Sequence, residues 1–208
     1  MDAEELLEKY AAGQRNFQKA DLREENLKGA DLSGIDLYGS NLSGADLSEA
    51  NLTLVNLNSA NLIKASLTNA NLNSLVGASS ANFGWADLSG ADLSWANFSS
   101  VTLNYADLQR ADLTGANLNN AKLFGANLDE ANLSGTSLDS ADIRVASLYK
   151  ANLSKANLNK ADLTEAYLLE ADFTMANLSE AILTQAKLQK AKFQKANLPA
   201  GVTKMPRR

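Results

Sequence analysis

Large apolar residues recur at every fifth position along nearly the whole chain. They run from Phe17 through Leu22 and Leu27 to Leu72, and again from Phe83 to Leu198, which makes 36 five-residue words. A period of five fits neither the 3.6-residue repeat of a helix nor the two-residue repeat of a strand. The pattern therefore predicts short extended pieces joined by frequent corners, and an internally repeated fold.

Each word has a fixed polarity around its large apolar residue, position i. Position i−2 is Ala in 29 of the 36 words, and position i−1 is Asp or Asn in 27. In extended backbone, i−2 and i point to the same side, so both should point inward and the other three positions outward. Repeated corners of one hand would then build a coil with a leucine-lined interior. Ala is expected at i−2 because a crowded corner leaves room for only a methyl group.

Charged residues indicate how many words complete one turn. Arg110, Glu130, Lys150, Glu170 and Lys190 all lie at i+2, twenty residues apart and with alternating sign. Four words per turn would stack them about 4.8 Å apart, where opposite charges attract. Coincidence among the possible columns is the alternative interpretation.

The word A-(D/N)-L-x-x resembles the repeat of the pentapeptide-repeat family over about residues 15 to 200. The resemblance implies an all-β fold, a right-handed quadrilateral β-helix of about nine coils. The stretch YAAGQRNFQKADL, residues 10–22, is similar to the N-terminus of cyanobacterial family members that regulate heterocyst differentiation.

Three segments are expected. Residues 1–13 read as a capping α-helix, with Asp2 as N-cap, Glu5 at the capping-box position and Gly13 as the stop. Residues 14–200 form the β-helix, and residues 201–208 a flexible tail. The one break in the repeat, near Leu75, predicts a one-residue bulge: Ala78 takes the Leu position of an imperfect word, and Leu75 is the inserted residue.

The composition argues against catalysis. The chain has no His and no Cys, and its many Asp residues occupy an outward position where Asn substitutes freely. No phosphate-binding loop, dinucleotide fingerprint or metal-ligand cluster appears. We therefore expect no catalytic residues, metal, cofactor or small-molecule substrate. With no apolar run of about 18 residues and no apolar signal segment, we also expect a cytoplasmic protein without a membrane span.

Outward apolar residues gather on one side of the predicted coil. With four words per turn, one face carries a candidate partner-binding set on successive coils: Ile63, Trp85, Tyr105, Phe124 and Val145. Exposed apolar patches mark partner sites, and Trp and Tyr are frequent binding hot spots. The alternative is that the stacked rings only stabilise their column. A weaker second patch holds Tyr149, Tyr167 and Leu169.

Charge is distributed unevenly along the chain. Residues 1–50 carry 11 acidic and 5 basic side chains, and residues 144–208 carry 5 and 11. The basic end could bind an acidic partner or nucleic acid, but protection of an open solenoid edge by lysines is the preferred interpretation.

The leading hypothesis is a non-catalytic, monomeric protein-interaction module with a regulatory role. By resemblance, its partner would be a transcriptional regulator in cyanobacterial cell differentiation. One alternative is a DNA mimic that binds DNA gyrase, but that branch of the family needs a long acidic surface and a C-terminal dimerisation helix, and this sequence departs on both points. A structural solenoid without a specific partner is the other alternative.

Overall fold

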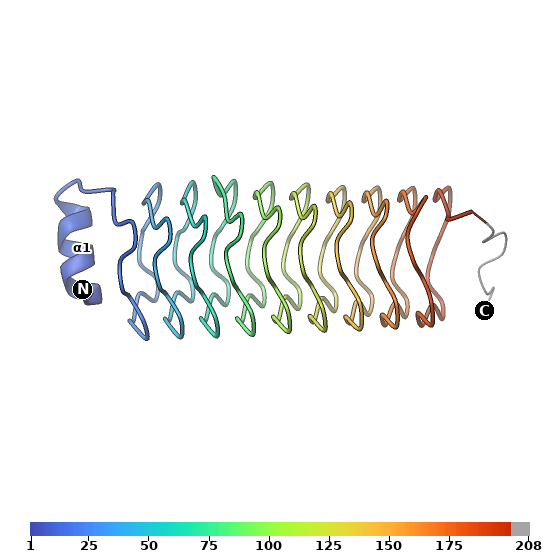
Figure 1. Cartoon of the computed structure of the whole chain (residues 1–208), viewed down its shortest axis with the longest axis horizontal. Coiled ribbons are helices and arrows are strands. Elements are labelled where there is room, and N and C mark those ends of the chain that lie inside the picture. The colour runs from blue at the N-terminus through green and yellow to red at the C-terminus, as the bar shows by residue number, and fades with distance from the viewer. Residues whose placement is uncertain (201–208) are drawn as a thin grey trace.

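A computed structural model describes residues 1–200 as one helix followed by a rod of stacked turns. The helix, α1, comprises Ala3–Ala11 and lies across one end of the rod, while the last turns form the other end (Figure 1). Asp2 is the N-cap, and its side chain accepts a hydrogen bond from the Glu5 N–H at 2.8 Å. The predicted tail, 201–208, lies outside the described residues.

The rod repeats every twenty residues. Parallel bridges join each i−1 residue to its equivalent one turn later, as in Asp21 to Asn41 and Asn132 to Asn152. Twenty residues are four words, so the predicted four words per turn is confirmed. Among residues 1–200 the β-structure consists of isolated bridges rather than extended strands, because two turn residues follow each bridge.

The words before the last one end in a tight turn that makes the corner. In the word centred on Leu113, the Ala116 N–H donates to the Leu113 carbonyl at 3.0 Å. The residue at i+2 has a positive φ, 67° at Gly115 and 58° at Tyr105, as in the third residue of a type II turn. Non-glycine residues in this conformation cost about 1 kcal/mol each, so the stacked ladder holds them there.

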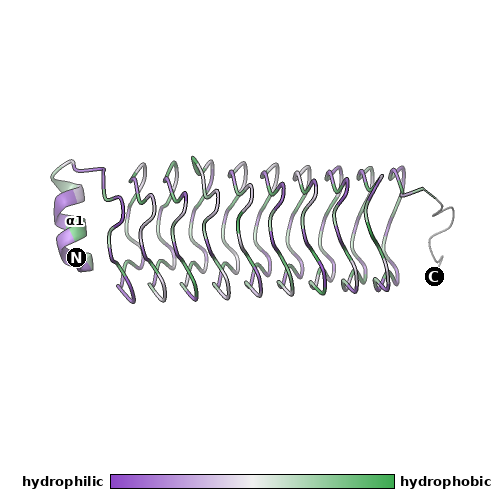
Figure 2. Ribbon diagram, in the orientation of Figure 1, coloured by the Kyte–Doolittle hydropathy of each residue, from purple (hydrophilic) through white to green (hydrophobic). Residues whose placement is uncertain are grey.

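The interior is made of the i and i−2 side chains, as the pattern predicted. Leu113, Leu133 and Leu153 lie on one wall of three successive turns and are buried, as are Ala111 and Ala131 at the corners. Figure 2 shows hydrophobic residues recurring in each turn along the rod. The core is therefore one continuous stack along the axis, and burial is uniform rather than concentrated at a centre.

The corner position is roomier than predicted. Ile35, Val55 and Val101 occupy i−2 and are fully buried, so the corner accepts more than a methyl group. Thr136 is also buried there, and its hydroxyl donates to the Leu113 carbonyl at 2.7 Å. Ala81 and Ala121 lie beside Val101 on the neighbouring turns, whereas Ile35 and Val55 lie next to each other, so Ala neighbours are not required for a larger side chain. A hydroxyl fits where a carbonyl can accept its proton.

The break differs from the prediction in which residue is extra. Leu75 is 2% exposed and fills the inward corner position, whereas Val76 is 59% exposed. The Val76 N–H donates to the Val55 carbonyl at 3.1 Å, and the Gly77 carbonyl accepts from the Leu57 N–H at 2.8 Å. On this turn two residues thus stand opposite one residue of the preceding turn. The hydrophobic effect favours burial of Leu75 and leaves the extra residue outside.

Gly77 is required by a close neighbour at this break. A Cβ built on Gly77 would lie 2.7 Å from Oδ1 of Asn58 on the preceding turn. That oxygen accepts the Ser79 N–H at 2.8 Å. The bridge register changes from twenty to twenty-one residues, as between Asn56 and Gly77, and the four sides stay aligned beyond it.

Atypical corner residues attach α1 to the first turns. Glu25 accepts a hydrogen bond from the Ala3 N–H at 2.8 Å, and Arg15 lies 3.9 Å from the centre of the Tyr10 ring. The Tyr10 hydroxyl donates to the Ser33 carbonyl at 2.8 Å, and Leu6 is buried against the rod. Arg15 and Glu25 replace Ala at i−2 in these words because they contact the helix instead of the coil interior.

The predicted charge ladder is formed in part. Arg110 contacts Glu130 at 3.1 Å, and Lys190 contacts Glu170 at 3.3 Å. Between these two pairs, the Lys150 ammonium lies 4.9 Å from the centre of the Tyr149 ring. Such exposed pairs contribute at most about 1 kcal/mol each, so they align the column more than they stabilise it.

Candidate functional site

Three of the five predicted site residues form a connected aromatic column. The rings of Trp85 and Tyr105, on successive turns, are stacked with centroids 5.3 Å apart and planes at 16°. Tyr105 meets Phe124 edge-on at 5.5 Å. Trp85 is 57% and Tyr105 48% exposed, while Phe124 is half-buried. We call Trp85, Tyr105 and Phe124 the aromatic column.

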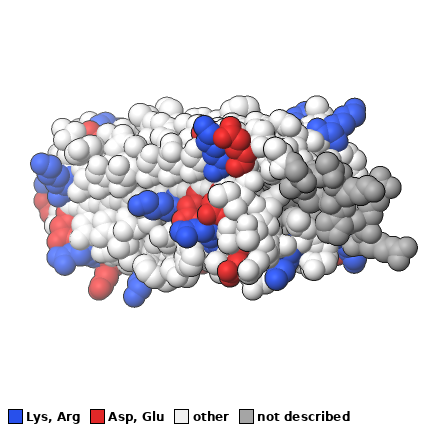
Figure 3. Space-filling view, turned by 45° about the vertical axis from the view of Figure 1, so that its right-hand side comes forward, with Lys and Arg blue, Asp and Glu red and all other residues white. Residues whose placement is uncertain are grey.

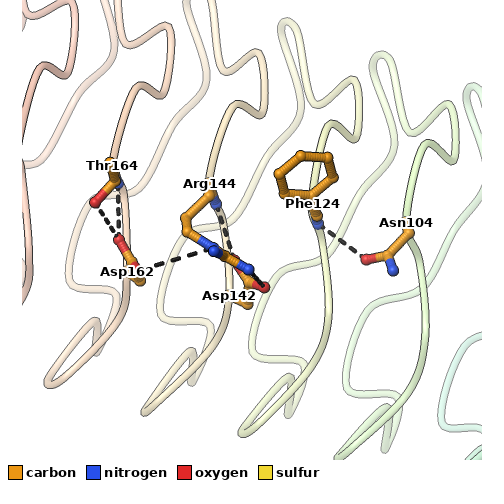
Figure 4. A network of polar contacts seen from close by, with 6 residues as sticks. All are labelled: Asn104, Phe124, Asp142, Arg144, Asp162 and Thr164. Atoms are coloured by element: carbon orange, nitrogen blue, oxygen red, sulfur yellow. Dashed lines mark hydrogen bonds and ion pairs between the residues drawn. The ribbon is translucent and has the colours of Figure 1, made fainter.

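The turns beneath the column are shaped to receive these rings. A Cβ added to Gly125 would lie 2.8 Å from the Tyr105 ring, so the ring packs directly on the glycine backbone of the next turn. The Phe124 N–H donates to Oδ1 of Asn104 on the preceding turn at 3.1 Å (Figure 4). This arrangement fixes ring positions before any partner binds, which lowers the entropy cost of binding.

The other two predicted residues flank the column. Ile63 lies on the turn before Trp85 and is half-buried, and Val145 lies two turns beyond Tyr105 and is 37% exposed. Gly125 stands between Tyr105 and Val145 in the same line of turn residues. The structure therefore places all five residues on one side of the rod, but ring contacts join only the aromatic column.

Arg144 extends this surface and was not predicted. Its guanidinium carbon lies 5.6 Å from the centre of the Phe124 ring. Its Nε donates to Asp142 at 2.7 Å and lies 3.8 Å from Asp162 on the next turn (Figure 4). Hydrogen bonds from the Arg144 side chain hold the pKa of the Asp142 carboxyl below its ordinary value. The paired carboxylates keep the guanidinium plane beside the aromatic ring, where cation–π attraction applies.

A second exposed apolar strip was missed by sequence reasoning. Trp95 is the most exposed large hydrophobic side chain of residues 1–200, at 67%. Leu54 lies two turns before it in the same line, and Val76 projects from the break on the turn between. The ring of Trp95 covers Gly115, where an added Cβ would lie 2.5 Å from it. We call Leu54, Val76 and Trp95 the Trp95 strip.

Only the register could have revealed the Trp95 strip. Trp85 and Trp95 are ten residues apart, half of one twenty-residue turn, so they project from opposite sides of the rod. Val76 was taken as an inward residue of the imperfect word, which hid its exposure. Correct placement of the bulge puts Leu54, Val76 and Trp95 on successive turns.

The smaller patch predicted from Tyr149, Tyr167 and Leu169 is less continuous. Tyr167 is exposed, while Tyr149 and Leu169 are half-buried. The ammonium of Lys150 lies over the Tyr149 ring and covers part of it. This patch presents less aromatic surface than the aromatic column.

Several carboxylates of the described residues accept local hydrogen bonds in their own word. The hydroxyl and the N–H of Ser48 both donate hydrogen bonds to Asp46. These bonds, that of the hydroxyl most of all, lower the pKa of the Asp46 carboxyl. No group of three or more acidic residues within 1–200 could hold a metal ion. No helix in that range is long and apolar enough to cross a membrane. Figure 3 shows one face of the molecule, which is largely uncharged and carries small groups of both signs.

Comparison with known proteins identifies the repeat. The family model described as pentapeptide repeats matches residues 16–53, 35–73, 79–115, 116–146, 146–185 and 170–199. A search of curated proteins finds no match.

Two solved structures are similar over most of the chain. HetL, a pentapeptide-repeat protein involved in heterocyst differentiation regulation from the cyanobacterium Nostoc sp. strain PCC 7120, is 32% identical, with a TM-score of 0.66 over 97% of this chain and 98% of its own. QnrB1, a plasmid-mediated fluoroquinolone resistance protein, is 18% identical, with a TM-score of 0.53 over 89% of this chain and 94% of its own. At that identity, the likeness to QnrB1 concerns the fold alone.

Proposed function

Because this chain belongs to the pentapeptide-repeat family, whose members fold as right-handed quadrilateral β-helices, we propose that it is a non-catalytic protein-interaction module. Its scaffold would be a rod of about nine turns, with α1 as the cap of its first turn. Such a rod is rigid before binding, because almost every word is bonded to the turns on both sides. Its location in the cytoplasm stays a prediction from the sequence.

The observation that carries this proposal is the aromatic column with Arg144 beside it. Trp, Tyr and Arg are the side chains most enriched among binding hot spots, and here all three types adjoin on one side of the rod. Ile63 and Val145 would extend the contact along the rod. Stacking explains why the rings are ordered, but it does not explain why aromatic residues are present. A left-handed turn position does not require them, since glycine adopts that conformation without strain.

The partner we propose is a protein, with a transcriptional regulator as the specific hypothesis. Its support is the likeness to HetL, which is involved in regulating heterocyst differentiation, over nearly the full length of both chains. The aromatic column does not favour nucleic acid, because it adjoins the carboxylates of Asp142 and Asp162 as well as Arg144.

The gyrase-binding alternative has weaker support. A DNA mimic needs one long acidic surface, whereas residues 181–200 contain four lysines and no acidic residue. The likeness to QnrB1 supports a shared fold only. We therefore retain the interaction module as the proposal, and the following experiment tests it against the alternative of a structural solenoid.

The test is partner recovery with a matched aromatic control. Wild-type protein, the double variant Trp85→Ala/Tyr105→Ala and the single variant Trp95→Ala would each be used to capture partners from a cyanobacterial lysate. Circular dichroism would verify that each variant is folded. Hot-spot truncations cost about 2 kcal/mol or more each, so the double variant should lose the partner at least tenfold.

The control variant separates recognition from general stickiness. Trp95 is more exposed than Trp85 and lies on the opposite side, so Trp95→Ala removes a comparable ring without touching the aromatic column. We expect wild-type recovery from it. Undiminished recovery by the folded double variant would contradict the proposal, and loss with Trp95→Ala instead would move the site to the Trp95 strip. Recovery of no specific protein by the wild type would favour the structural solenoid.

A further inference from the structure

The C-terminal end of the rod exposes part of its apolar interior. Leu183, Leu188 and Phe193 are only half-buried, although their equivalents one turn earlier, such as Leu163 and Phe173, are fully buried. Phe193 stacks on Phe173 with centroids 5.0 Å apart, so one side of its ring is packed in the manner of the interior. A further layer laid over this end would bury the remaining surface, as each turn does for the one before it.

Basic side chains surround this apolar end. Residues 181–200 contain four lysines, at 187, 190, 192 and 195, and no acidic residue. Lys190 and Lys192 are paired with Glu170 and Asp172 on the preceding turn, at 3.3 and 3.5 Å. Lys187 and Lys195 are exposed and form no ion pair within the described part of the chain. The end therefore suits an acidic surface with some apolar character.

The opposite end of the same molecule offers such a surface. Glu4, Leu7, Glu8 and Ala11 share one stripe of α1, spaced three and four residues apart, and all four are exposed. The neighbouring stripe, with Leu6 and Tyr10, packs on the rod. The outer stripe thus combines the carboxylates of Glu4 and Glu8 with the side chain of Leu7.

From this complementarity we propose that the C-terminal end of one copy binds the outer stripe of α1 of a second copy. The contact is heterologous, head to tail, so it extends into short linear chains of rods. An isologous contact between two C-terminal ends would bring eight lysines together and is disfavoured by repulsion. The segment 201–208 contains Lys204, Arg207 and Arg208 and no acidic residue. Because it is basic, it does not suit the basic C-terminal end of the rod as the occupant.

The contact should be weak and sensitive to salt. The contact involves only one end of the rod and one stripe of α1, and small contacts of this kind are typical of weak, transient complexes. Exposed charges are screened over about 8 Å at physiological ionic strength, so much of the attraction should vanish in concentrated salt. Dilute protein should therefore be monomeric, in agreement with the expectation from sequence, and associate only as its concentration rises.

Sedimentation velocity over a wide range of protein concentration is the first measurement. The weight-average mass should rise with concentration in dilute buffer and fall towards that of the monomer at about 0.5 M salt. The variant Lys187→Glu/Lys195→Glu should weaken association at least tenfold. The control Lys155→Glu/Lys160→Glu changes the net charge equally on earlier turns and should leave association within about twofold of wild type. Circular dichroism would confirm that both variants are folded.

Mixing two variants tests the pairing directly. Glu4→Lys/Glu8→Lys alone and Lys187→Glu/Lys195→Glu alone should each stay monomeric, because both ends then carry like charge. An equimolar mixture should form alternating linear chains, since the new lysines on one α1 meet the new glutamates on the other rod end, and the unchanged acidic α1 and basic end of the two variants still attract each other. A wild-type mass that stays monomeric at high concentration, or a mixture that fails to associate, would overturn the proposal. Equal association of Lys155→Glu/Lys160→Glu and Lys187→Glu/Lys195→Glu would also overturn the proposal.

Discussion

At the scale of single residues, the Asp and Asn of each word serve the backbone. The side-chain oxygen at i−1 accepts the N–H of residue i+1, at 2.9 Å for Asp46 and Ser48 and 3.2 Å for Asn51 and Thr53. Either side chain supplies this acceptor, which explains the free exchange of Asp and Asn.

In several words whose i−1 residue is neither Asp nor Asn, the preceding turn supplies the acceptor. Asn119 accepts the Asp139 N–H at 3.0 Å in the word whose i−1 residue is Ser137, and Asn104 does the same for Phe124 in the word of Lys122. The sequence predicts the local turn. The replacement acceptor, however, joins residues twenty apart, so it is evident only when the turns are stacked.

The first prediction concerns acid stability. The pKa of Asp46 is lowered in the folded protein, so its contribution to stability is complete above its unfolded value near 3.9 and is lost as pH falls through the folded value. Asp46→Asn keeps the acceptor and cannot be protonated. Its melting temperature should therefore match wild type near pH 7 and fall less between about pH 4 and 2. An unchanged acid profile would contradict this role of Asp46.

The second prediction tests the acceptor from the neighbouring turn. Asn119→Ala leaves the Asp139 N–H without its partner and should cost about 1 to 3 kcal/mol in unfolding free energy. Ser99→Ala, at the equivalent position one turn earlier, is the control and should change it by less than about 0.5 kcal/mol. Chemical denaturation measures both values. Equal, small losses would show that the cross-turn bond contributes nothing.

At the scale of elements, the two irregular segments were predicted to different extents. The helix at residues 3–11 follows from Asp2, Glu5 and Gly13, which are local signals. The break was located correctly in the chain, but its extra residue was misassigned, because a local count cannot tell whether Leu75 or Val76 is buried. Only the bonds to Val55 and Leu57 on the preceding turn decide that question.

The third prediction concerns α1. Deletion of residues 1–13 should expose Phe17, Leu22 and the first strand edges, and cause aggregation or a lower melting temperature. Leu6→Ala should cost about 2 to 5 kcal/mol, because Leu6 is buried against the rod. Leu7→Ala, its exposed neighbour, should cost less than about 0.5 kcal/mol. A deletion variant as stable and monomeric as wild type would show that α1 is no cap.

The fourth prediction concerns one turn of the core. Leu133 is buried on all sides by the turns above and below, so Leu133→Ala should cost about 2 to 5 kcal/mol. Ser134→Ala, one residue further on and outward, should change stability little. Thermal unfolding compares the two, and equal losses would contradict the inward placement of Leu133.

At the scale of the whole molecule, the repeat determines the architecture, whereas individual residues determine the properties of the surface. Period, polarity and the charge column were sufficient to predict four words per turn and a leucine interior. The aromatic column was predicted as a set, but its stacking on Gly125 and its contact with Arg144 depend on side-chain geometry. In the Trp95 strip, Leu54 and Trp95 occupy regular outward positions, and only the exposure of Val76 between them depends on the placement of the bulge.

Photo-cross-linking to the partner tests the proposed interaction surface most directly. Lys64 and Ser74 both have a left-handed turn conformation, both are exposed, and each lies one turn before a tryptophan, Trp85 and Trp95 respectively. A photoreactive amino acid would be placed at either position, and the partner recovered by the wild type would be added. We expect a covalent adduct from position 64 and none from position 74. An adduct from position 74 alone, or from neither position while binding persists, would contradict the account.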